Sequence, residues 1–170
     1  MKLLILNGGS CSGKSSIIKY IMKKREHFFH LSYDSLKWSF SNYTSDKYYQ
    51  DVQKIVLAVA SAVFKMKYDV VSDSTLYSKS REELINLATI AGYQILEVNL
   101  EAAHEVLTQR FDERVASALA TPERRISNLS KDRFQELIDI FEKEKNPQAI
   151  SIRTDIQNIE DVAESILKLW

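Results

Sequence analysis

The sequence feature that most constrains this chain is a glycine-rich turn near its start, which fits the pattern G-x-x-x-x-G-K-[ST] at every fixed position. Its residues are Gly8-Gly9-Ser10-Cys11-Ser12-Gly13-Lys14-Ser15. The apolar run Leu3–Leu6 precedes the turn and predicts a buried strand, while Ser15–Lys24 follows with apolar residues at helical spacing. Glycines let the backbone N–H groups turn inward to cradle phosphate oxygens, and the start of the helix adds positive charge. The turn therefore predicts a site for the phosphates of a nucleotide.

Within this turn, each side chain has an expected task toward ATP and Mg²⁺. The ammonium of Lys14 can reach the β- and γ-phosphates, which makes it a catalytic candidate, and the hydroxyl of Ser15 can ligate Mg²⁺. The ATP-binding residues predicted here are Gly8, Gly9, Ser10, Cys11, Ser12, Gly13, Lys14, Ser15 and Ser16. Cys11 occupies a variable position of the pattern. It is either a tolerated small side chain or, because a thiol near a helix N-terminus can be reactive, a redox-sensitive group.

The rest of the chain alternates short apolar runs with segments of helical spacing. Strands are expected at Leu3–Leu6, Phe28–Tyr33, Tyr68–Ser72, Tyr93–Leu100 and Gln148–Ile152, and helices at Ser15–Lys24, Asp46–Met66, Ser80–Ala91, Ala102–Ala118, Asp132–Lys145 and Ile159–Leu169. This alternation predicts parallel pairing through right-handed crossovers, hence a three-layer α/β/α fold around a five-stranded sheet. The 170 residues contain no repeat or linker, so one domain, 1–170, is expected.

Composition excludes several classes of partner. The 23 Lys and Arg residues balance the 23 Asp and Glu residues, so there is no bulk attraction to nucleic acid or to an anionic membrane. The N-terminal apolar run is far shorter than the roughly 18 residues of a membrane span, and it lacks the pattern of a signal peptide. A single Cys cannot form an internal disulfide. We therefore expect a cytoplasmic protein that binds small molecules, with neither nucleic acid nor membrane as partner.

At the segment Leu6–Ile17 the sequence resembles the opening of chloramphenicol phosphotransferase and related small P-loop kinases. The run Tyr33-Asp34-Ser35-Leu36 continues the likeness, which beyond about residue 40 becomes the general pattern of adenylate kinase-like enzymes. The resemblance implies a P-loop kinase fold with a small helical lid at about 115–131. It also implies that Asp34 acts as the base on a substrate hydroxyl and that 154–158 forms part of the adenine pocket.

Asp34 has a physical argument of its own. It follows a predicted strand expected to lie beside the strand of the phosphate-binding turn, where a carboxylate could accept a hydroxyl proton or hold that hydroxyl in line with the γ-phosphate. Asp34 would equally suit the N-cap of a following helix. Asp73 ends the apolar run Val70-Val71-Ser72 and resembles the second metal-site residue of P-loop proteins, which implies a Mg²⁺ role. A turn position is the alternative for Asp73.

Two groups of arginines resemble those of adenylate kinase-like enzymes. Arg110 and Arg114 lie four apart on one helical face, as in the pair that introduces the lid, which implies ATP contacts for both and a catalytic role for Arg114. A solvated face paired with neighbouring acids is the alternative. Within the expected lid, Arg124 or Arg125 would stabilise the transferring phosphate, and Arg125 is taken as the catalytic candidate. A solvated surface pair is the alternative there.

The acceptor site is expected among aromatic residues. The segment after Asp34 contains Trp38, Phe40, Tyr43, Tyr48 and Tyr49. It lies where related kinases bind the phosphate acceptor, and these kinases often carry an acceptor-binding arginine near position 81. Trp38 and Arg81, together with Asp34, are therefore the expected substrate-binding residues. The alternatives are that the aromatic residues cover the core and that Arg81 belongs to a capped surface helix.

These observations together predict an ATP- and Mg²⁺-dependent kinase that transfers the γ-phosphate of ATP to a hydroxyl of a small molecule. The alternative is a nucleotide-hydrolysing switch or ATPase that acts on a protein partner. The chain contains no Asn-Lys-x-Asp guanine signature, which argues against a GTP-dependent switch.

Overall fold

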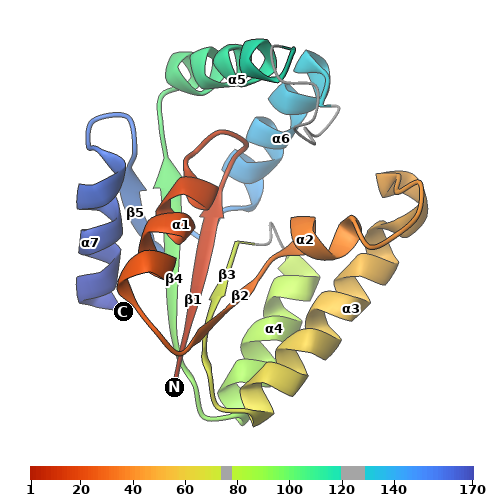
Figure 1. Ribbon diagram of the computed structural model, residues 1–170, viewed down its shortest axis with the longest axis vertical. Coiled ribbons are helices and arrows are strands. Elements are labelled where there is room, and N and C mark those ends of the chain that lie inside the picture. The colour runs from red at the N-terminus through yellow and green to blue at the C-terminus, as the bar shows by residue number, and fades with distance from the viewer. Residues whose placement is uncertain (74–77, 120–128) are drawn as a thin grey trace.

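The computed structural model describes residues 1–73, 78–119 and 129–170. Its elements in chain order are β1 (Lys2–Gly8), α1 (Lys14–Lys24), β2 (Phe28–Leu31), α2 (Tyr33–Lys37), α3 (Ser45–Lys65), β3 (Asp69–Ser72), α4 (Ser78–Ile90), β4 (Gln94–Glu101), α5 (His104–Leu119), α6 (Lys131–Glu144), β5 (Ile150–Arg153) and α7 (Ile159–Leu169). Helices flank one twisted sheet (Figure 1). The predicted α/β class and five-stranded parallel sheet are confirmed.

The strand order of this sheet is β2-β3-β1-β4-β5. The expectation that β2 lies beside β1 is wrong, because β3 lies between them and pairs with both. The physical reason is burial: Val70 and Val71 of β3 are fully buried, as an inner strand of a parallel sheet requires, while Phe29 of β2 is 37% exposed. The more exposed strand takes the edge position.

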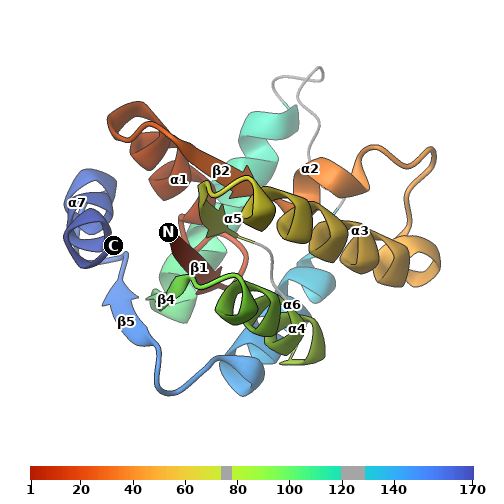
Figure 2. The ribbon, with the colours of Figure 1, turned by 90° about the horizontal axis from the view of Figure 1, so that it is seen from below.

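Alternate side chains of β1 pack into two separate hydrophobic cores, one on each face of the sheet. Leu3 and Ile5 pack with residues of α3 and α4, and Leu4 and Leu6 pack with residues of α1 and α7. This division follows from the alternation of side chains along a strand. Figure 2 shows the result, with α1 and α7 on one side of the sheet and α3 and α4 on the other.

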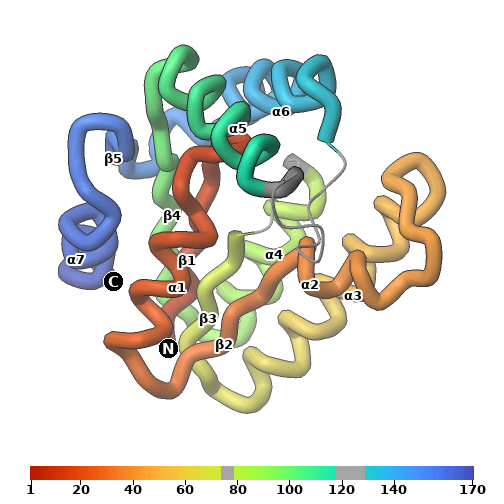
Figure 3. Tube along the Cα trace, turned by 45° about the horizontal axis from the view of Figure 1, so that its top comes forward, coloured from red at the N-terminus to blue at the C-terminus, as the bar shows by residue number. Residues whose placement is uncertain are grey.

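A third cluster lies beyond the carboxyl ends of the strands, where α5 and α6 meet. Phe111 of α5 stacks on Phe134 of α6 with ring centroids 4.3 Å apart, and Leu107 and Ile138 complete the cluster. In Figure 3, this end is turned forward, with α5 and α6 above the sheet. Ligands of open α/β sheets bind at this end. Within the described ranges, no helix has the length and apolar character needed to cross a bilayer.

The sequence indicated a helix here only through the alternative role of Asp34 as an N-cap, and it predicted no range for α2. Ser32 is its N-cap, since its Oγ accepts a hydrogen bond from the Ser35 N–H at 3.3 Å. The alternative role of Asp34 as N-cap is therefore wrong, because Asp34 lies inside the first turn of this helix. A helix of five residues is too short to show an apolar period, so the sequence pattern gives no signal for it.

Candidate active site

The phosphate-binding turn between β1 and α1 is a tightly curled backbone that needs its glycines. Gly13 precedes α1 with a φ of +97°, a left-handed conformation that favours glycine. A β-carbon at Gly8 would overlap the Ser12 side chain and lie 3.1 Å from the carbonyl oxygen of Leu100. The turn is closed by a hydrogen bond from the Ser12 N–H to the Gly9 carbonyl at 3.3 Å. The sequence motif thus produces the predicted cradle.

Two polar groups in this cradle are poised for an anion. The Oγ of Ser12 is buried and has no hydrogen-bond partner in the described part of the chain. The ammonium of Lys14 donates hydrogen bonds to the carbonyls of Gly8 and Gly9, the latter at 3.0 Å. Burial lowers the pKa of Lys14, while the negative charges of Asp73 and Asp34 oppose that shift. A triphosphate fits this arrangement, because it would supply acceptors to both groups.

One large cavity lies over the cradle, with a volume of about 890 Å³. Its walls come from the phosphate-binding turn and α1, from α2 and the segment after it, from the end of β3, from α5 and α6, and from the loop between β5 and α7. The lining includes the predicted residues Gly8, Gly9, Ser10, Cys11, Ser12, Gly13, Lys14, Ser15, Ser16, Asp34, Trp38, Asp73, Arg110 and Arg114. The fold therefore brings almost the whole predicted site to one place.

The two predicted acids both line this cavity but differ in environment. The Asp34 side chain is 76% exposed and its Oδ1 lies 2.6 Å from the Nζ of Lys37. Asp73, at the end of β3, is largely buried, and its Oδ1 lies 3.2 Å from Nε2 of His30 on the neighbouring strand β2. The Asp34 carboxylate is thus accessible to a ligand in the cavity, while the Asp73 carboxylate is held against the sheet by its contact with His30.

A magnesium ion would find oxygen donors near the cradle. The Asp73 carboxylate and the exposed Ser15 residue both line the cavity. Among the described residues there is no group of three or more His, Cys, Asp and Glu side chains able to hold a metal ion. Mg²⁺ characteristically uses one or two protein oxygens together with substrate phosphates and water, so this sparse donor set fits it.

Arg110, the first arginine of the predicted pair, forms hydrogen bonds to two walls of the cavity. Arg110 donates to the Cys11 carbonyl at 3.4 Å, to the Thr154 Oγ1 at 3.2 Å and to the Thr154 carbonyl at 2.6 Å. It therefore joins the phosphate-binding turn to the loop after β5. Arg114 lies one turn further along α5, exposed on the cavity lining.

The loop after β5 is fixed by its own carboxylate. Asp155 accepts a hydrogen bond from the Ala103 N–H at 2.8 Å and pairs with Arg153. The hydrogen bonds from Arg153 and from the Ala103 backbone lower the pKa of Asp155 well below its usual range. Thr154 and Gln157 of the predicted adenine segment face the cavity on either side of this anchor.

The aromatic segment divides between the two roles considered for it. Trp38, Tyr43 and Tyr49 line the cavity together with Tyr33 of α2. The hydroxyls of Tyr33 and Tyr43 are hydrogen-bonded at 2.8 Å, and burial raises the pKa of Tyr33 far above its usual range. Phe40 and Tyr48 pack against the core and do not line the cavity, whereas Tyr33 and Tyr43 do both.

Arg81 is not brought to the cavity with the other predicted residues. Its Nη1 donates to Glu97 Oε2 on β4 at 2.8 Å, and Asn146 donates to the same oxygen at 3.1 Å. The ion pair of Arg81 and Glu97 thus joins α4 to β4, and Arg81 is not among the residues that line the cavity. Arg124 and Arg125, like most of the expected lid at 115–131, lie outside the described residues.

Sequence reasoning did not single out several residues that line the cavity. Lys19, Lys37 and Leu137 are among them, whereas Gln157 belongs to the expected adenine segment and Arg133 was a weaker candidate for the catalytic arginine. Lys37 could have been found from its spacing, since it stands three residues after Asp34 on a helix. The others come from elements whose approach to the cavity depends on tertiary packing, for which the sequence carries no local signal.

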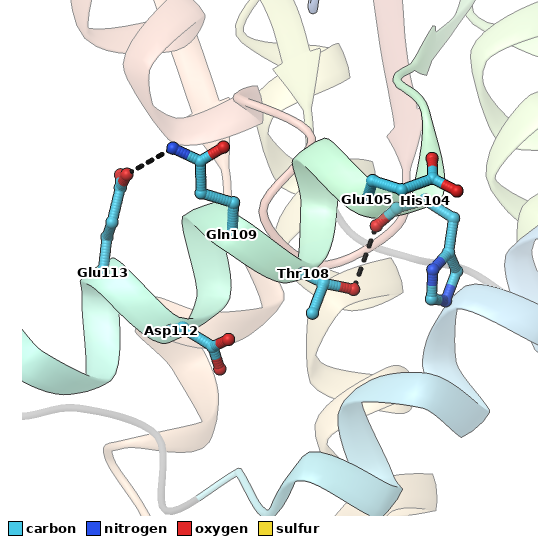
Figure 4. Close-up of a pocket in the computed structure, with 6 residues that line it drawn as sticks. All are labelled: His104, Glu105, Thr108, Gln109, Asp112 and Glu113. Atoms are coloured by element: carbon cyan, nitrogen blue, oxygen red, sulfur yellow. Dashed lines mark hydrogen bonds between the residues drawn. The ribbon is translucent and has the colours of Figure 1, made fainter.

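A second hollow, of about 570 Å³, runs along the outer face of α5 (Figure 4). Two of its hydrogen bonds lie within the helix: Thr108 donates to the His104 carbonyl at 3.0 Å and Gln109 to Glu113 at 2.9 Å. The His104 ring contacts Gln135 of α6 at 2.5 Å, and Asp112 lies 3.9 Å from the ammonium of Lys131. The six lining residues all belong to this one helix. Without a second wall, this surface has none of the convergent groups of a binding site.

Comparison with solved structures places the chain among P-loop kinases by fold. A protein of Chloroflexus aurantiacus described as a candidate kinase matches with a TM-score of 0.70 and 15% identity, over 98% of this chain and 97% of that one. The APS kinase of Mycobacterium tuberculosis, solved with AMPPNP and APS, matches with a TM-score of 0.66 and 18% identity, over 99% and 96%. A sugar kinase from Janibacter gives a TM-score of 0.66 and 16% identity, over 99% and 93%.

The fold and the curled glycine-rich turn together are those of the P-loop kinase fold class. The Zeta toxin family profile matches residues 2–165, and the chain therefore belongs to the Zeta toxin family. No curated protein matches the sequence. The P-loop kinase resemblance seen in the sequence is thus confirmed, whereas these comparisons do not confirm the narrower likeness to chloramphenicol phosphotransferase.

Proposed function

We propose that the protein is an ATP-dependent phosphotransferase that moves the γ-phosphate of ATP to a hydroxyl of a small molecule. The observation that carries this proposal is the single cavity of about 890 Å³, which the phosphate cradle and Asp34 share. Small-molecule sites usually enclose about 300–1,000 Å³, so this cavity has the size for such ligands. Its aromatic wall beside Asp34 suits a small organic acceptor more than the surface of a protein partner.

The nucleotide would be held by the cradle end of the cavity. Backbone N–H groups of 8–15 and the ammonium of Lys14 would bind the phosphates, together with Arg110 and Arg114 of α5, which also line the cavity. Mg²⁺, when bound through Ser15 and Asp73, would neutralise phosphate charge. The partial burial of Lys14 would strengthen its attraction to the phosphates, because water screens it less than it screens a fully exposed ammonium.

Asp34 would act on the acceptor. The acceptor oxygen forms a bond to the γ-phosphorus while the bond from that phosphorus to the β–γ bridging oxygen breaks, which releases ADP. The hydroxyl proton passes to the Asp34 carboxylate or to water, and the carboxylate also holds the hydroxyl in line. Arg114 would balance the charge of the transferring group, and Arg125 remains a predicted contributor. Trp38 would contact the acceptor.

Two steps test this proposal. A thermal-shift screen of small metabolites with AMPPNP and Mg²⁺ identifies acceptors, since a ligand at 100 times its dissociation constant adds about 2.7 kcal/mol of stability. Transfer of ³²P from ATP to the acceptor so found is then compared between variants. Asp34→Asn is expected to lower transfer by about 100-fold or more while AMPPNP still binds, because it removes the proton acceptor.

The matched control for this test is Asp51→Asn. Asp51 is an exposed acid that also pairs with a lysine three residues later, but it does not line the cavity. Its transfer rate should equal that of the wild type. Full turnover by Asp34→Asn would remove the role given to Asp34, and ATP hydrolysis that responds only to a protein partner would favour the switch hypothesis.

A further inference from the structure

We propose that Lys37 is a positioning residue that orients the Asp34 carboxylate for the acceptor hydroxyl. The inference rests on the proposed function, because it gives Asp34 the task of receiving that hydroxyl. It starts from the ion pair on the cavity wall, in which Lys37 Nζ lies 2.6 Å from Asp34 Oδ1. Lys37 itself does not touch the reacting atoms in this proposal, and it acts only through Asp34.

The two members of this pair are unequally anchored. The side chain of Lys37 is 15% exposed, whereas that of Asp34 is 76% exposed. The ammonium lies 5.0 Å from the ring centre of Trp38 and 5.9 Å from that of Tyr43, close enough for both rings to attract a cation. The lysine is therefore the fixed partner, and the carboxylate is the partner that meets the contents of the cavity.

Local structure holds this lysine in place. Asp34 and Lys37 stand three residues apart on α2, the spacing at which helical side chains meet. Ser32 caps the start of the helix. Beyond its end, the ring of Trp38 packs edge-on to that of Tyr43, with ring centroids 6.2 Å apart. The rings of Trp38 and Tyr43 therefore both lie beside the Lys37 ammonium, and the ion pair is part of the packing of this segment.

The geometry leaves half of the carboxylate available. Lys37 contacts Oδ1, and within the described residues the structure gives Oδ2 no partner. One fixed oxygen restricts rotation of the carboxylate, so that the other oxygen can accept a hydrogen bond from a hydroxyl in a defined direction. Holding a reacting hydroxyl in the attacking geometry is worth large rate factors, which a freely rotating carboxylate would forfeit. Asp34 also lies near enough to Lys14 to influence its pKa.

A second pair in the same protein provides the control. Lys54 lies 3.3 Å from Asp51 with the same spacing of three residues, but their side chains are 76% and 55% exposed. Neither residue lines the cavity. An exposed pair of this kind contributes little, so Lys54→Met removes the same charge without consequence.

The experiment measures γ-phosphate transfer from ATP to water in single turnovers with excess protein and Mg²⁺, so that no acceptor need be identified. Lys37→Met should lower this rate about ten- to a hundredfold, because a misplaced catalytic group loses that much. Binding of AMPPNP with Mg²⁺, measured by calorimetry, should not change. Lys37→Arg should restore most of the rate, and Lys54→Met should match the wild type. Melting temperatures establish that each variant folds.

The decisive readout is the double variant. In the Asp34→Asn background, Lys37→Met should cause no further loss, because the lysine acts through that carboxylate. An equal loss in both backgrounds would overturn the inference, as would a wild-type rate for Lys37→Met while Asp34→Asn is slow. In the last case the proposed function still stands. Wild-type hydrolysis by Asp34→Asn would instead overturn the role of Asp34 and the positioning role with it.

Discussion

The two ends of the cavity are built by different means. The end proposed to bind the nucleotide, called the nucleotide end, is built around a backbone turn curled at Gly8 and Gly13 and anchored to the centre of the sheet through β1. The acceptor end consists of side chains on α2 and the segment after it, joined by contacts such as the bond between the Tyr33 and Tyr43 hydroxyls. Under the proposed function, phosphate binding would therefore depend on a short rigid motif, while acceptor choice would depend on side chains that can change one at a time.

The largest expected effect is the loss of phosphate transfer when the nucleotide end is disrupted at Lys14. Lys14→Met removes a partly buried ammonium that contacts the loop carbonyls and that we propose binds the phosphates. We expect a loss of transfer of about 100- to 1,000-fold, the range found when one preorganised donor to a developing charge is removed. Lys23→Met, an exposed change on the same helix, is the control and should transfer at the wild-type rate. Near-normal transfer by Lys14→Met would show that the cradle does not carry the reaction.

A smaller effect is expected from a substitution at the acceptor end, which should weaken acceptor binding but not nucleotide binding. Tyr33→Phe removes the hydroxyl bonded to Tyr43, which should cost about 1 kcal/mol of unfolding free energy and weaken acceptor binding severalfold. AMPPNP affinity should stay constant, since the hydroxyl lies on the acceptor wall. Tyr20→Phe is the matched control, because it removes a 2.8 Å bond to Glu164 away from the cavity. Urea unfolding and calorimetry measure both variants. Equal acceptor affinities for the two would contradict the division of the cavity.

The smallest expected effect concerns the acid sensitivity of the nucleotide end. The folded-state pKa of Asp155 is lowered, so its ionised carboxylate stabilises the loop after β5. This stabilisation is fully present at any pH well above the unfolded-state pKa of about 3.9. That contribution is lost as the pH falls through the folded-state pKa. Asp155→Asn should therefore be less stable than the wild type at pH 7, and its stability should fall less between pH 5 and pH 2. Urea unfolding across that range measures this, and parallel curves for the two proteins would refute it.

The nucleotide end could be predicted from the sequence because its residues dictate their own backbone. The motif from Gly8 to Ser15 forms the expected cradle, and Gly92, with a φ of +79°, ends α4 within a residue or two of the predicted position. Apolar runs identified all five strands, because burial of both faces leaves a strong pattern. Helix and strand ends shifted by one or two residues, as ends that fray commonly do.

What escaped prediction depends on contacts between distant elements. The position of β3 between β1 and β2 follows from which strand buries both faces, a property of the assembled sheet. Arg81 meets Glu97 only because α4 begins over β4, and no local pattern indicates that approach. Lys37 was overlooked because α2 is too short to show an apolar period, although its spacing from Asp34 was present in the sequence.

The contacts that hold the phosphate-binding turn have a consequence for how the protein is made. The Cys11 carbonyl is held by Arg110, and a β-carbon at Gly9 would lie 3.7 Å from Ile138, so the motif is walled by residues about a hundred positions later in the chain. Such distant contacts can form only after a large part of the polypeptide exists. A nascent chain that ends before Arg110 therefore contains the motif without these contacts. Under the proposed function, firm binding of ATP would then begin only after the residues of α5 and α6 have been synthesised.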